Sequence, residues 1–446
     1  MPFGLYRIRL LHHIGCLGLL LAVIGCGVSA NPAASAVNTP VSAEASVATQ
    51  ASSPTPTVSP TPTPTPIPVA EGLSSDPYKL PLTIQHVSGT SAVLYFELSS
   101  SAEGVVTVQA DQAGSGEQVV PFDASSTTHQ VILDNLTPGL TYHAAVDVMT
   151  PDSQYQHPGF LNSEWGDVSF KTWADKQPIR FGIVGDSGFG DPVTPKIAAQ
   201  MAAANLDFGL QVGDIVYNID ENKDAFEAFA LKYYRPFAPI LRQMPVYLVL
   251  GNHDDEAAAM WNGAPFYDHA FPLFSDPLFP QTSTPSHDWY AFAYGTVQFL
   301  MLDTEAMNNT RARQDEKAWL AERLSDTRFT TSIPVFHVPP YTGGAHVNDG
   351  VAVRADWVPM FKQAGVKLVL SGHDHNYQRL IEDGVTYIVS GGGSATLYAK
   401  TADVPGSQVF NRISHFVTFD VYPDHIDLQA VALGGNVIDQ ASVPLK

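Results

Sequence analysis

The sequence predicts an α/β fold for most of the chain, preceded by a small all-β sandwich domain. From residue 176 onward, short apolar runs alternate with stretches of helical periodicity, which indicates mainly parallel strands joined by helices. Between residues 73 and 175, β-rich runs follow one another with turn residues between them, a pattern typical of a β-sandwich. We therefore expect two folded domains, residues 73–175 and residues 176–446.

Residues 1–26 have the pattern of an export signal. Arg7 and Arg9 precede an apolar stretch, residues 14–24, that is too short to span a membrane. Small residues lead up to Cys26 and resemble the lipobox of bacterial lipoproteins, in which the cysteine is acylated. This resemblance implies a membrane-anchored lipoprotein facing the periplasm or the cell exterior. The alternative is a plain secretory signal in which Cys26 is incidental.

A tether is predicted over residues 27–72. This segment consists largely of Ala, Ser, Thr and Pro, with Pro-Thr alternation over residues 54–68. It has too little apolar bulk to form a core, so we expect disorder or polyproline II structure. The only cysteines in the chain are Cys16 and Cys26, so the folded domains contain neither a disulfide nor a thiolate metal site.

The charge balance excludes one class of partner. The 446 residues include 23 Lys and Arg against 44 Asp and Glu, for a net charge of −21. Nucleic acids require a basic surface, so no nucleic acid binding surface is expected. A small phosphorylated substrate remains compatible with this charge, because bound metal cations could supply the positive charge.

The β domain offers no constellation of catalytic residue types. We expect strands over residues 91–98, 104–108 and 141–148, and residues 136–142 resemble a turn of fibronectin type III domains. Its histidines are scattered and are interpreted as surface or core residues: His86, His129, His143 and His157. This domain is therefore predicted to be a packing or spacer module.

In the α/β domain, polar residues follow the ends of predicted strands. These strands cover residues 180–184, 207–212, 246–250, 333–336 and 367–371. Ligands of an open α/β sheet lie beyond the carboxyl ends of its strands, so we expect these polar side chains to converge in one crevice. Asp, Asn, His and Tyr supply oxygen and nitrogen donors without sulfur, which suits iron, zinc or manganese. Two such ions ~3.5–4 Å apart can hold a phosphoryl group and activate water.

The order of these motifs resembles the calcineurin-like metallophosphoesterase superfamily. The motifs are Asp186-Ser187-Gly188, Gly213-Asp214-Ile215-Val216-Tyr217, Gly251-Asn252-His253-Asp254, His337 and Gly372-His373-Asp374-His375. Tyr217, three residues after Asp214, is similar to the mark of the purple acid phosphatase branch. The resemblance covers residues 178–446 and implies an αββα sandwich, with a fibronectin type III-like domain before it as is usual in that branch.

The resemblance also implies a role for each motif residue. Asp186, Tyr217 and His375 would hold one metal ion, Asn252, His337 and His373 the other, and Asp214 would bridge them. A tyrosine ligand implies Fe(III), because a phenol of pKa ~10 must lose its proton to bind well; the second ion would be Fe(II), zinc or manganese. His253 and His346 would be the catalytic histidines that contact phosphate or protonate the leaving group.

Simpler interpretations stay open for several of these residues. Tyr217 could be a packing residue, His253 could support a ligand, and His346 could be a solvated loop residue. Asp254, Asp374 and Arg379 are expected to support other groups rather than to react. Two positions depart from the family pattern. Ile219 stands where an Asp often orients the substrate histidine, which leaves the orientation of His253 undecided, and Pro334 stands where an aliphatic residue usually precedes the His337 ligand.

The implied function is hydrolysis of phosphate monoesters by attack of a metal-bound hydroxide. A phosphodiesterase or nucleotidase with the same metal core is the nearest alternative, because substrate choice depends on long loops such as residues 255–296 and 340–356. A surface binding protein without turnover is a third hypothesis. It would be favoured by a missing ligand, and every candidate ligand is present.

Overall fold

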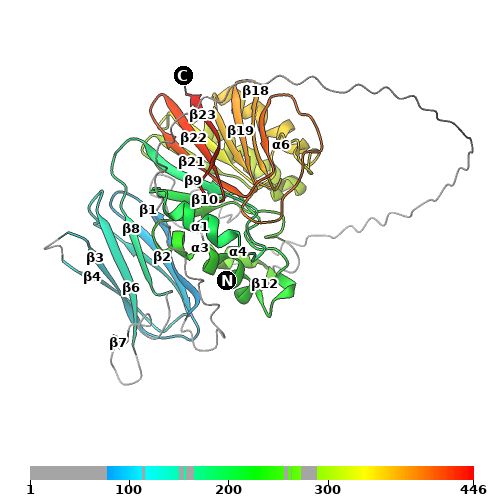
Figure 1. The fold of residues 1–446 in the computed structure, drawn as a ribbon. Coiled ribbons are helices and arrows are strands. Elements are labelled where there is room, and N and C mark those ends of the chain that lie inside the picture. The colour runs from blue at the N-terminus through cyan, green and yellow to red at the C-terminus, as the bar shows by residue number, and fades with distance from the viewer. Residues whose placement is uncertain are drawn as a thin grey trace, which may run out of the picture. The chain divides into compact units, whose positions relative to one another are not determined.

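The computed structural model describes residues 78–445 except 113–115, 150–154, 157–164, 256–259, 263 and 273–288 (Figure 1). The predicted signal, the predicted tether and His157 lie outside the described residues. Within the described part, every helix is too short or too polar to cross a membrane. Ala70–Lys446 is one compact unit that includes both predicted domains, so the domain boundary between residues 175 and 176 stays a prediction.

The first part of the unit contains two antiparallel sheets. One sheet has the order β1 (Tyr78–Val87), β2 (Ala92–Leu98), β5 (Thr128–Leu133). The other has the order β4 (Gln118–Phe122), β3 (Gly104–Ala110), β6 (Thr141–Met149), with β7 (Tyr155–Gln156) and β8 (Asp167–Lys171) both paired to β6. Alternate residues of these strands face a shared core that includes Phe96, Val106 and Phe170, as expected where apolar residues recur with period two.

The second part contains two larger sheets. The first has the order β11 (Val246–Leu248), β10 (Phe208–Gln211), β9 (Ile179–Val184), β21 (His415–Val421), β22 (His425–Ala432), β23 (Val437–Pro444). The second has the order β14 (Tyr290–Tyr294), β15 (Val297–Met301), β16 (Thr331–Val335), β17 (Leu368–Ser371), β19 (Val385–Ser390), β18 (Tyr377–Glu382), β20 (Ser407–Asn411). A short hairpin of β12 (Met260–Trp261) and β13 (Ala264–Pro265) lies apart from both.

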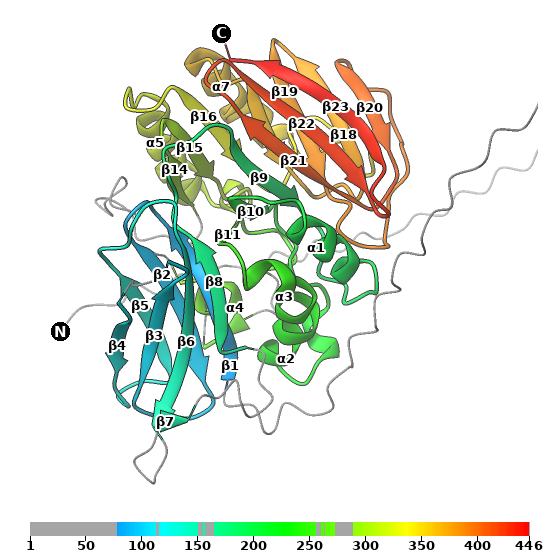
Figure 2. The same cartoon turned by 60° about the vertical axis from the view of Figure 1, so that its left-hand side comes forward.

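Helices cover the outer face of each large sheet (Figure 2). Against the first sheet pack α1 (Thr194–Ala202), α2 (Ala225–Phe229), the π-helical turn η4 (Ala230–Tyr234), α3 (Arg235–Leu241) and α4 (Phe266–Ala270). Against the second pack α5 (Thr310–Leu324), α6 (Val351–Asp356) and α7 (Val358–Ala364). Short 3₁₀ turns cover Ile219–Glu221 and Glu305–Asn308.

The core between the two large sheets is aromatic. Phe181 of β9 stacks on Phe208 of β10 and on Phe419 of β21, and it meets Phe299 of β15 edge to face. Side chains from both sheets interdigitate in this layer, which excludes water between the sheets and fixes them against each other. The order helix, sheet, sheet, helix confirms the predicted αββα class.

The expectation of mainly parallel pairing is only partly correct. Pairing is parallel among β9, β10 and β11 and among β15, β16, β17 and β19. The remaining neighbours are antiparallel, including β21–β22–β23. Short turns join these last three strands, and a short turn permits only antiparallel pairing, whereas parallel pairing needs a long crossover.

Candidate metal centre

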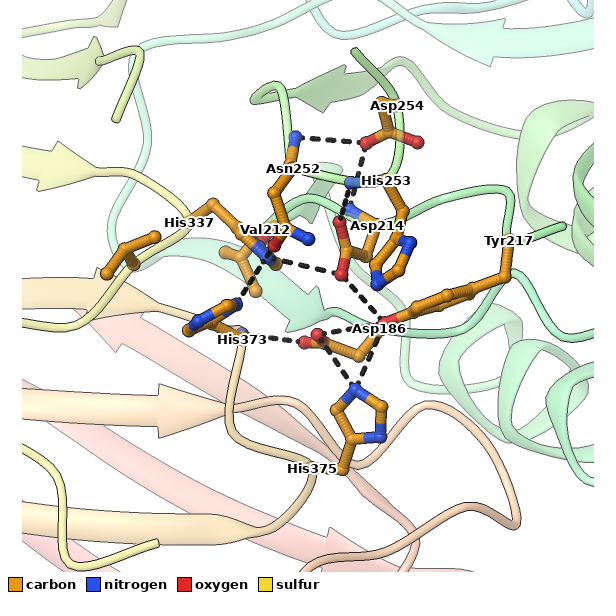
Figure 3. Close-up of polar contacts among 12 residues, drawn as sticks. Asp186, Val212, Asp214, Tyr217, Asn252, His253, Asp254, His337, His373 and His375 are labelled. Atoms are coloured by element: carbon orange, nitrogen blue, oxygen red, sulfur yellow. Dashed lines mark hydrogen bonds and ion pairs between the residues drawn. The ribbon is translucent and has the colours of Figure 1, made fainter. Parts of the chain in front are cut away.

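The predicted ligands follow the carboxyl ends of parallel strands (Figure 3). Asp186 follows β9, Asp214 follows β10, Asn252 follows β11, His337 follows β16, and the pair of histidines follows β17. The structure brings all the predicted metal ligands together: Asp186, Asp214, Tyr217, Asn252, His337, His373 and His375. The ligands thus come from the strand ends of both large sheets, where the sequence predicts that polar side chains converge.

The backbone at this edge adopts conformations that are rare for residues with side chains. Asp186, Asp214 and His373 have positive φ angles of 58°, 54° and 69°, a region that costs free energy for residues other than glycine and that recurs at functional sites. Two glycines permit the close approach of the loops. A Cβ at Gly213 would lie 2.4 Å from His337 Nδ1, and one at Gly251 would lie 2.2 Å from Asp214 Oδ1.

A first cluster surrounds the Tyr217 hydroxyl. The hydroxyl donates to Asp214 Oδ2 at 2.8 Å and lies 3.2 Å from Asp186 Oδ1 and 3.0 Å from His375 Nε2. On the far side of its ring, His375 Nδ1 donates to Thr396 O at 3.0 Å. That hydrogen bond fixes the tautomer and leaves the Nε2 lone pair directed into the cluster.

A second cluster surrounds His337 Nε2. This atom lies 3.2 Å from Asn252 Oδ1, 3.2 Å from His373 Nδ1 and 3.3 Å from Asp214 Oδ2. His337 Nδ1 donates to Val212 O at 2.8 Å, so its Nε2 lone pair also points inward. Asp214 Oδ2 thus contributes to both clusters.

The electrostatics of the centre favour a cation. Burial alone would lower the pKa of His337, but Asp214 and Asp186 raise it to about 10. Burial alone would raise the pKa of Asp214, but His337 and His253 bring it below its ordinary range. Burial, followed by both carboxylates, raises the pKa of Tyr217 well above 10, so its phenol keeps its proton unless a strongly acidic cation replaces it.

The donor set therefore fits metal ions. Carboxylate oxygens and imidazole lone pairs converge within 4.8 Å of one another in two buried groups, Asp186–Asp214–His375 and Asp214–His337–His373. Negative charge gathered in a buried place requires positive charge between the groups, and oxygen and nitrogen donors of this kind suit iron, zinc or manganese.

The two predicted catalytic histidines lie at the rim of the centre. The backbone N–H of His253 donates to Asp214 Oδ1 at 3.0 Å, and its ring lies 4.4 Å from the Tyr217 ring. His346 lies with its ring 4.1 Å from the His373 ring, and about a third of its side chain is exposed. Both side chains are thus within reach of a group bound at the clusters.

Three further predicted supporting residues have structural partners. Asp254 accepts from the backbone N–H groups of four residues in the two neighbouring loops: Asp214, Ile215, Val216 and Gly251. Asp374 holds the loop that carries His346, and Arg379 pairs with Asp439. Asp254 and Asp374 thus hold loops of the centre, whereas Arg379 joins β18 to β23.

Sequence reasoning missed several residues beside the centre. Lys232 is buried in the π-helical turn, and its Nζ donates to the carbonyl of Tyr217 at 2.7 Å. Phe189 stacks on the Tyr217 ring, and Tyr398 stacks on the His375 ring. Asp349 lies 3.0 Å from both His346 and His373. Apart from Phe189, which lies in the loop after β9, these residues do not follow a strand end directly. A lysine inside an apolar helical run is nevertheless a signal that could have identified Lys232.

Residues 179–377 match the family model described as calcineurin-like phosphoesterase. This chain contains a calcineurin-like phosphoesterase domain. The resemblance on which the sequence interpretation rests is therefore confirmed. The matched range begins at β9 and ends just after His375, so it includes every candidate ligand described above.

Curated relatives of the phosphoesterase domain include purple acid phosphatases. The chain is 27% identical over 249 residues to purple acid phosphatase 21 of Arabidopsis thaliana, covering 54% of this chain and 53% of the relative. It is 27% identical over 245 residues to human tartrate-resistant acid phosphatase type 5, covering 48% of this chain and 73% of that relative. The chain thus spans about half the length of the plant relative.

Solved structures share the fold. A purple acid phosphatase from yellow lupin (Lupinus luteus) seeds superposes with a TM-score of 0.62 at 16% identity, covering 81% of this chain and 73% of that one. A structure of PhoD superposes with a TM-score of 0.59 at 14% identity, covering 84% and 90%. At these identities the likeness concerns the fold, and it extends over more of the chain than the phosphoesterase domain.

Proposed function

We propose that this protein is a metal-dependent phosphoric ester hydrolase that cleaves phosphate monoesters at a dinuclear centre. The observation that carries the proposal is the pair of buried clusters that share Asp214 Oδ2. The match to the calcineurin-like phosphoesterase family and the similarity to purple acid phosphatases support it.

The donor types suggest which ions the centre would hold. The cluster with Tyr217 suits Fe(III), because its phenol loses its proton only to a strongly acidic ion. The cluster of Asn252, His337 and His373 suits Fe(II), zinc or manganese. When bound, two such ions would draw in the phosphate oxygens and lower the pKa of the attacking water.

The remaining steps fall to side chains of this chain. His253 is held by its backbone to Asp214 and by its ring against Tyr217, and we assign it the proton that passes to the leaving alkoxide. His346 would contact a phosphate oxygen from the other side, next to His373. General acid catalysis by a positioned side chain contributes ~10²–10⁴-fold.

An assay against two esters tests this function. Purified protein should hydrolyse p-nitrophenyl phosphate faster than bis(p-nitrophenyl) phosphate, and an alkyl monoester should depend more on His253 because an alkoxide leaves poorly without a proton. We expect His253→Asn to lower kcat for the alkyl monoester by ~100-fold or more. His425→Asn is the matched control, since that histidine lies on β22 beside Asp424 and far from the clusters.

Each other outcome points to a different function. Faster turnover of the diester would replace the monoester assignment with phosphodiesterase or nucleotidase activity. Metal-loaded protein that hydrolyses neither ester would favour the surface binding hypothesis. A colourless protein that contains only zinc and is active would rule out the Fe(III)–tyrosinate assignment, so metal content and visible absorption are measured on the same sample.

We further propose that the protein is exported and anchored by a lipid on Cys26, with residues 27–72 as the tether and a fibronectin type III-like spacer before the phosphoesterase domain. The support is the sequence pattern of residues 1–72. In a bacterial host, labelled fatty acid should be incorporated into the full chain, and Cys26→Ser should remove the label while Cys16→Ser retains it. Incorporation that survives Cys26→Ser would refute the anchor.

A further inference from the structure

The loop that carries His346 is fastened to the strand end that supplies two candidate ligands. Asp374 lies between His373 and His375, and its Oδ1 accepts from the backbone N–H groups of Ala345 at 2.7 Å and His346 at 3.3 Å. Thr342 Oγ1 donates to the other oxygen of Asp374. A Cβ at position 344 would lie 2.4 Å from Asp374 Oδ1, so the loop approaches this closely only with glycine there.

These hydrogen bonds to Asp374 hold the loop so that Asp349 lies beside the second cluster. Asp349 Oδ2 lies 3.0 Å from His373 Nε2 and 3.0 Å from His346 Nδ1. The other ring nitrogen of His373, Nδ1, lies 3.2 Å from His337 Nε2 and faces the cluster (Figure 3). One carboxylate oxygen therefore joins a candidate ligand and a candidate phosphate-facing histidine.

The two contacts of Asp349, with His373 and with His346, differ in burial. The His373 side chain is 10% exposed, whereas His346 is 32% and Asp349 is 46% exposed. An exposed carboxylate–histidine contact contributes little by itself because water screens it. A carboxylate that accepts from the outer nitrogen of a buried ligand histidine has a larger effect, because it fixes the tautomer and the ring orientation of that ligand.

We propose that Asp349 is a positioning residue that orients His373 toward the second cluster and holds His346 beside it. With the proton of His373 kept on Nε2 by Asp349, the Nδ1 lone pair is available to the cluster. The same carboxylate oxygen holds His346 beside His373. The inference rests on the proposed dinuclear centre and adds a residue to it.

Zinc retention tests the role of Asp349 without reference to turnover. Full-length protein is loaded with Zn²⁺ alone and challenged with graded EDTA, and retained zinc is counted by mass spectrometry. Asp349→Asn and Asp349→Ala should each weaken the more easily removed zinc by ~10–100-fold, the usual cost of losing such a partner, and leave the other zinc unchanged. Asp349→Glu, which keeps a carboxylate, should recover part of the loss.

Two control variants separate the two contacts of Asp349 from general effects of a substitution on the protein. Asp111→Asn removes a carboxylate 2.6 Å from a histidine on the exposed face of β6 and should retain both zinc ions as wild type does. His346→Ala removes only the exposed contact between Asp349 and His346. It should retain zinc within ~3-fold of wild type, because the contact between Asp349 and His373 remains. Far-UV circular dichroism and urea midpoints confirm that each variant is folded.

The outcomes distinguish this inference from the function on which it rests. Wild-type retention of both zinc ions in Asp349→Asn and Asp349→Ala would overturn the positioning role, whatever the activity. Wild-type protein that hydrolyses neither ester when loaded with iron or with the metals it carries on purification would defeat the proposed function, while the zinc measurements would still decide the role of Asp349. Equal zinc loss in His346→Ala and Asp349→Ala would assign the effect to His346 instead.

Discussion

The β-sandwich and the phosphoesterase domain each place an aspartate against a histidine, with very different surroundings. In the sandwich, Asp111 lies 2.6 Å from His143 Nε2, and Ser169 lies 2.5 Å from His143 Nδ1. The side chains of Asp111 and His143 are 60% and 55% exposed. In the phosphoesterase domain, Asp214 and His337 are 2% and 0% exposed, so water screens the first pair and not the second.

The two groups also differ in where their members come from. His143 and Ser169 are directly opposite each other on β6 and β8, and Asp111 directly follows the neighbouring β3. Such a triple requires only that side chains of adjacent strands meet on one face. The buried clusters instead draw residues from loops after several strands, with positive φ at Asp186, Asp214 and His373. The same residue types are therefore expected to support chemistry only where their side chains are buried and converge from several loops.

The largest expected difference between the two regions concerns Asp214 and Asp111. Asp214→Asn removes the charge shared by both clusters and should lower kcat/KM for p-nitrophenyl phosphate by more than ~100-fold, beyond what the loss of an outer partner of a ligand costs. The matched change Asp111→Asn should leave kcat/KM within ~2-fold, because its partner is exposed. Steady-state kinetics and zinc content on the same preparations measure both.

Survival of activity in Asp214→Asn would break this comparison, since it would refute the bridging role. A comparable loss in Asp111→Asn would also break it, because the exposed triple would then act on the reaction. Reduced zinc content in Asp214→Asn together with reduced activity would place the effect at the clusters rather than in a step remote from them.

Much of the centre could be predicted from the sequence because strand ends determine it. Apolar runs that lead into Gly-Asp, Gly-Asn-His or Gly-His-Asp-His identify positions at the carboxyl ends of β9, β10 and β11 in one sheet and of β17 in the other. Parallel pairing aligns the strand ends within each sheet, and the packing of the two sheets brings the two sets of ends together. Asp186 and His375 lie far apart in the chain, yet Asp186 Oδ1 lies 3.4 Å from His375 Nε2.

Other parts depend on contacts that no local pattern encodes. Asp349 reaches His373 only because Asp374 fastens the loop before it, and Lys232 reaches Tyr217 O through a π-helical turn. The antiparallel strands β21, β22 and β23 have the same apolar character as parallel ones, so their direction follows from short turns and from the edge that β9 leaves open. Non-local packing decides each of these features.

A smaller expected effect concerns His86, a histidine of the β-sandwich that is buried, unlike His143. His86 on β1 is 2% exposed, and its Nδ1 lies 2.9 Å from the hydroxyl of Tyr247 on β11. Burial lowers the pKa of His86 to about 4 from an ordinary value of 6.5. His86 is thus a titratable group of the sandwich that is as buried as those of the metal centre, at the contact with the first large sheet.

The sign of the resulting pH dependence follows from proton uptake. Below pH 6.5 the unfolded chain binds a proton at His86, whereas the folded protein does not until about pH 4. Stability is therefore complete above pH 6.5 and is lost as the pH falls from 6.5 to 4, by up to ~3 kcal/mol for a shift of this size. His86→Gln should reduce the acid-dependent loss in urea unfolding free energy between pH 7 and pH 4 by that amount. An unchanged loss would mean that His86 gains access to water before the protein unfolds, and that the contact between β1 and β11 opens on its own in acid.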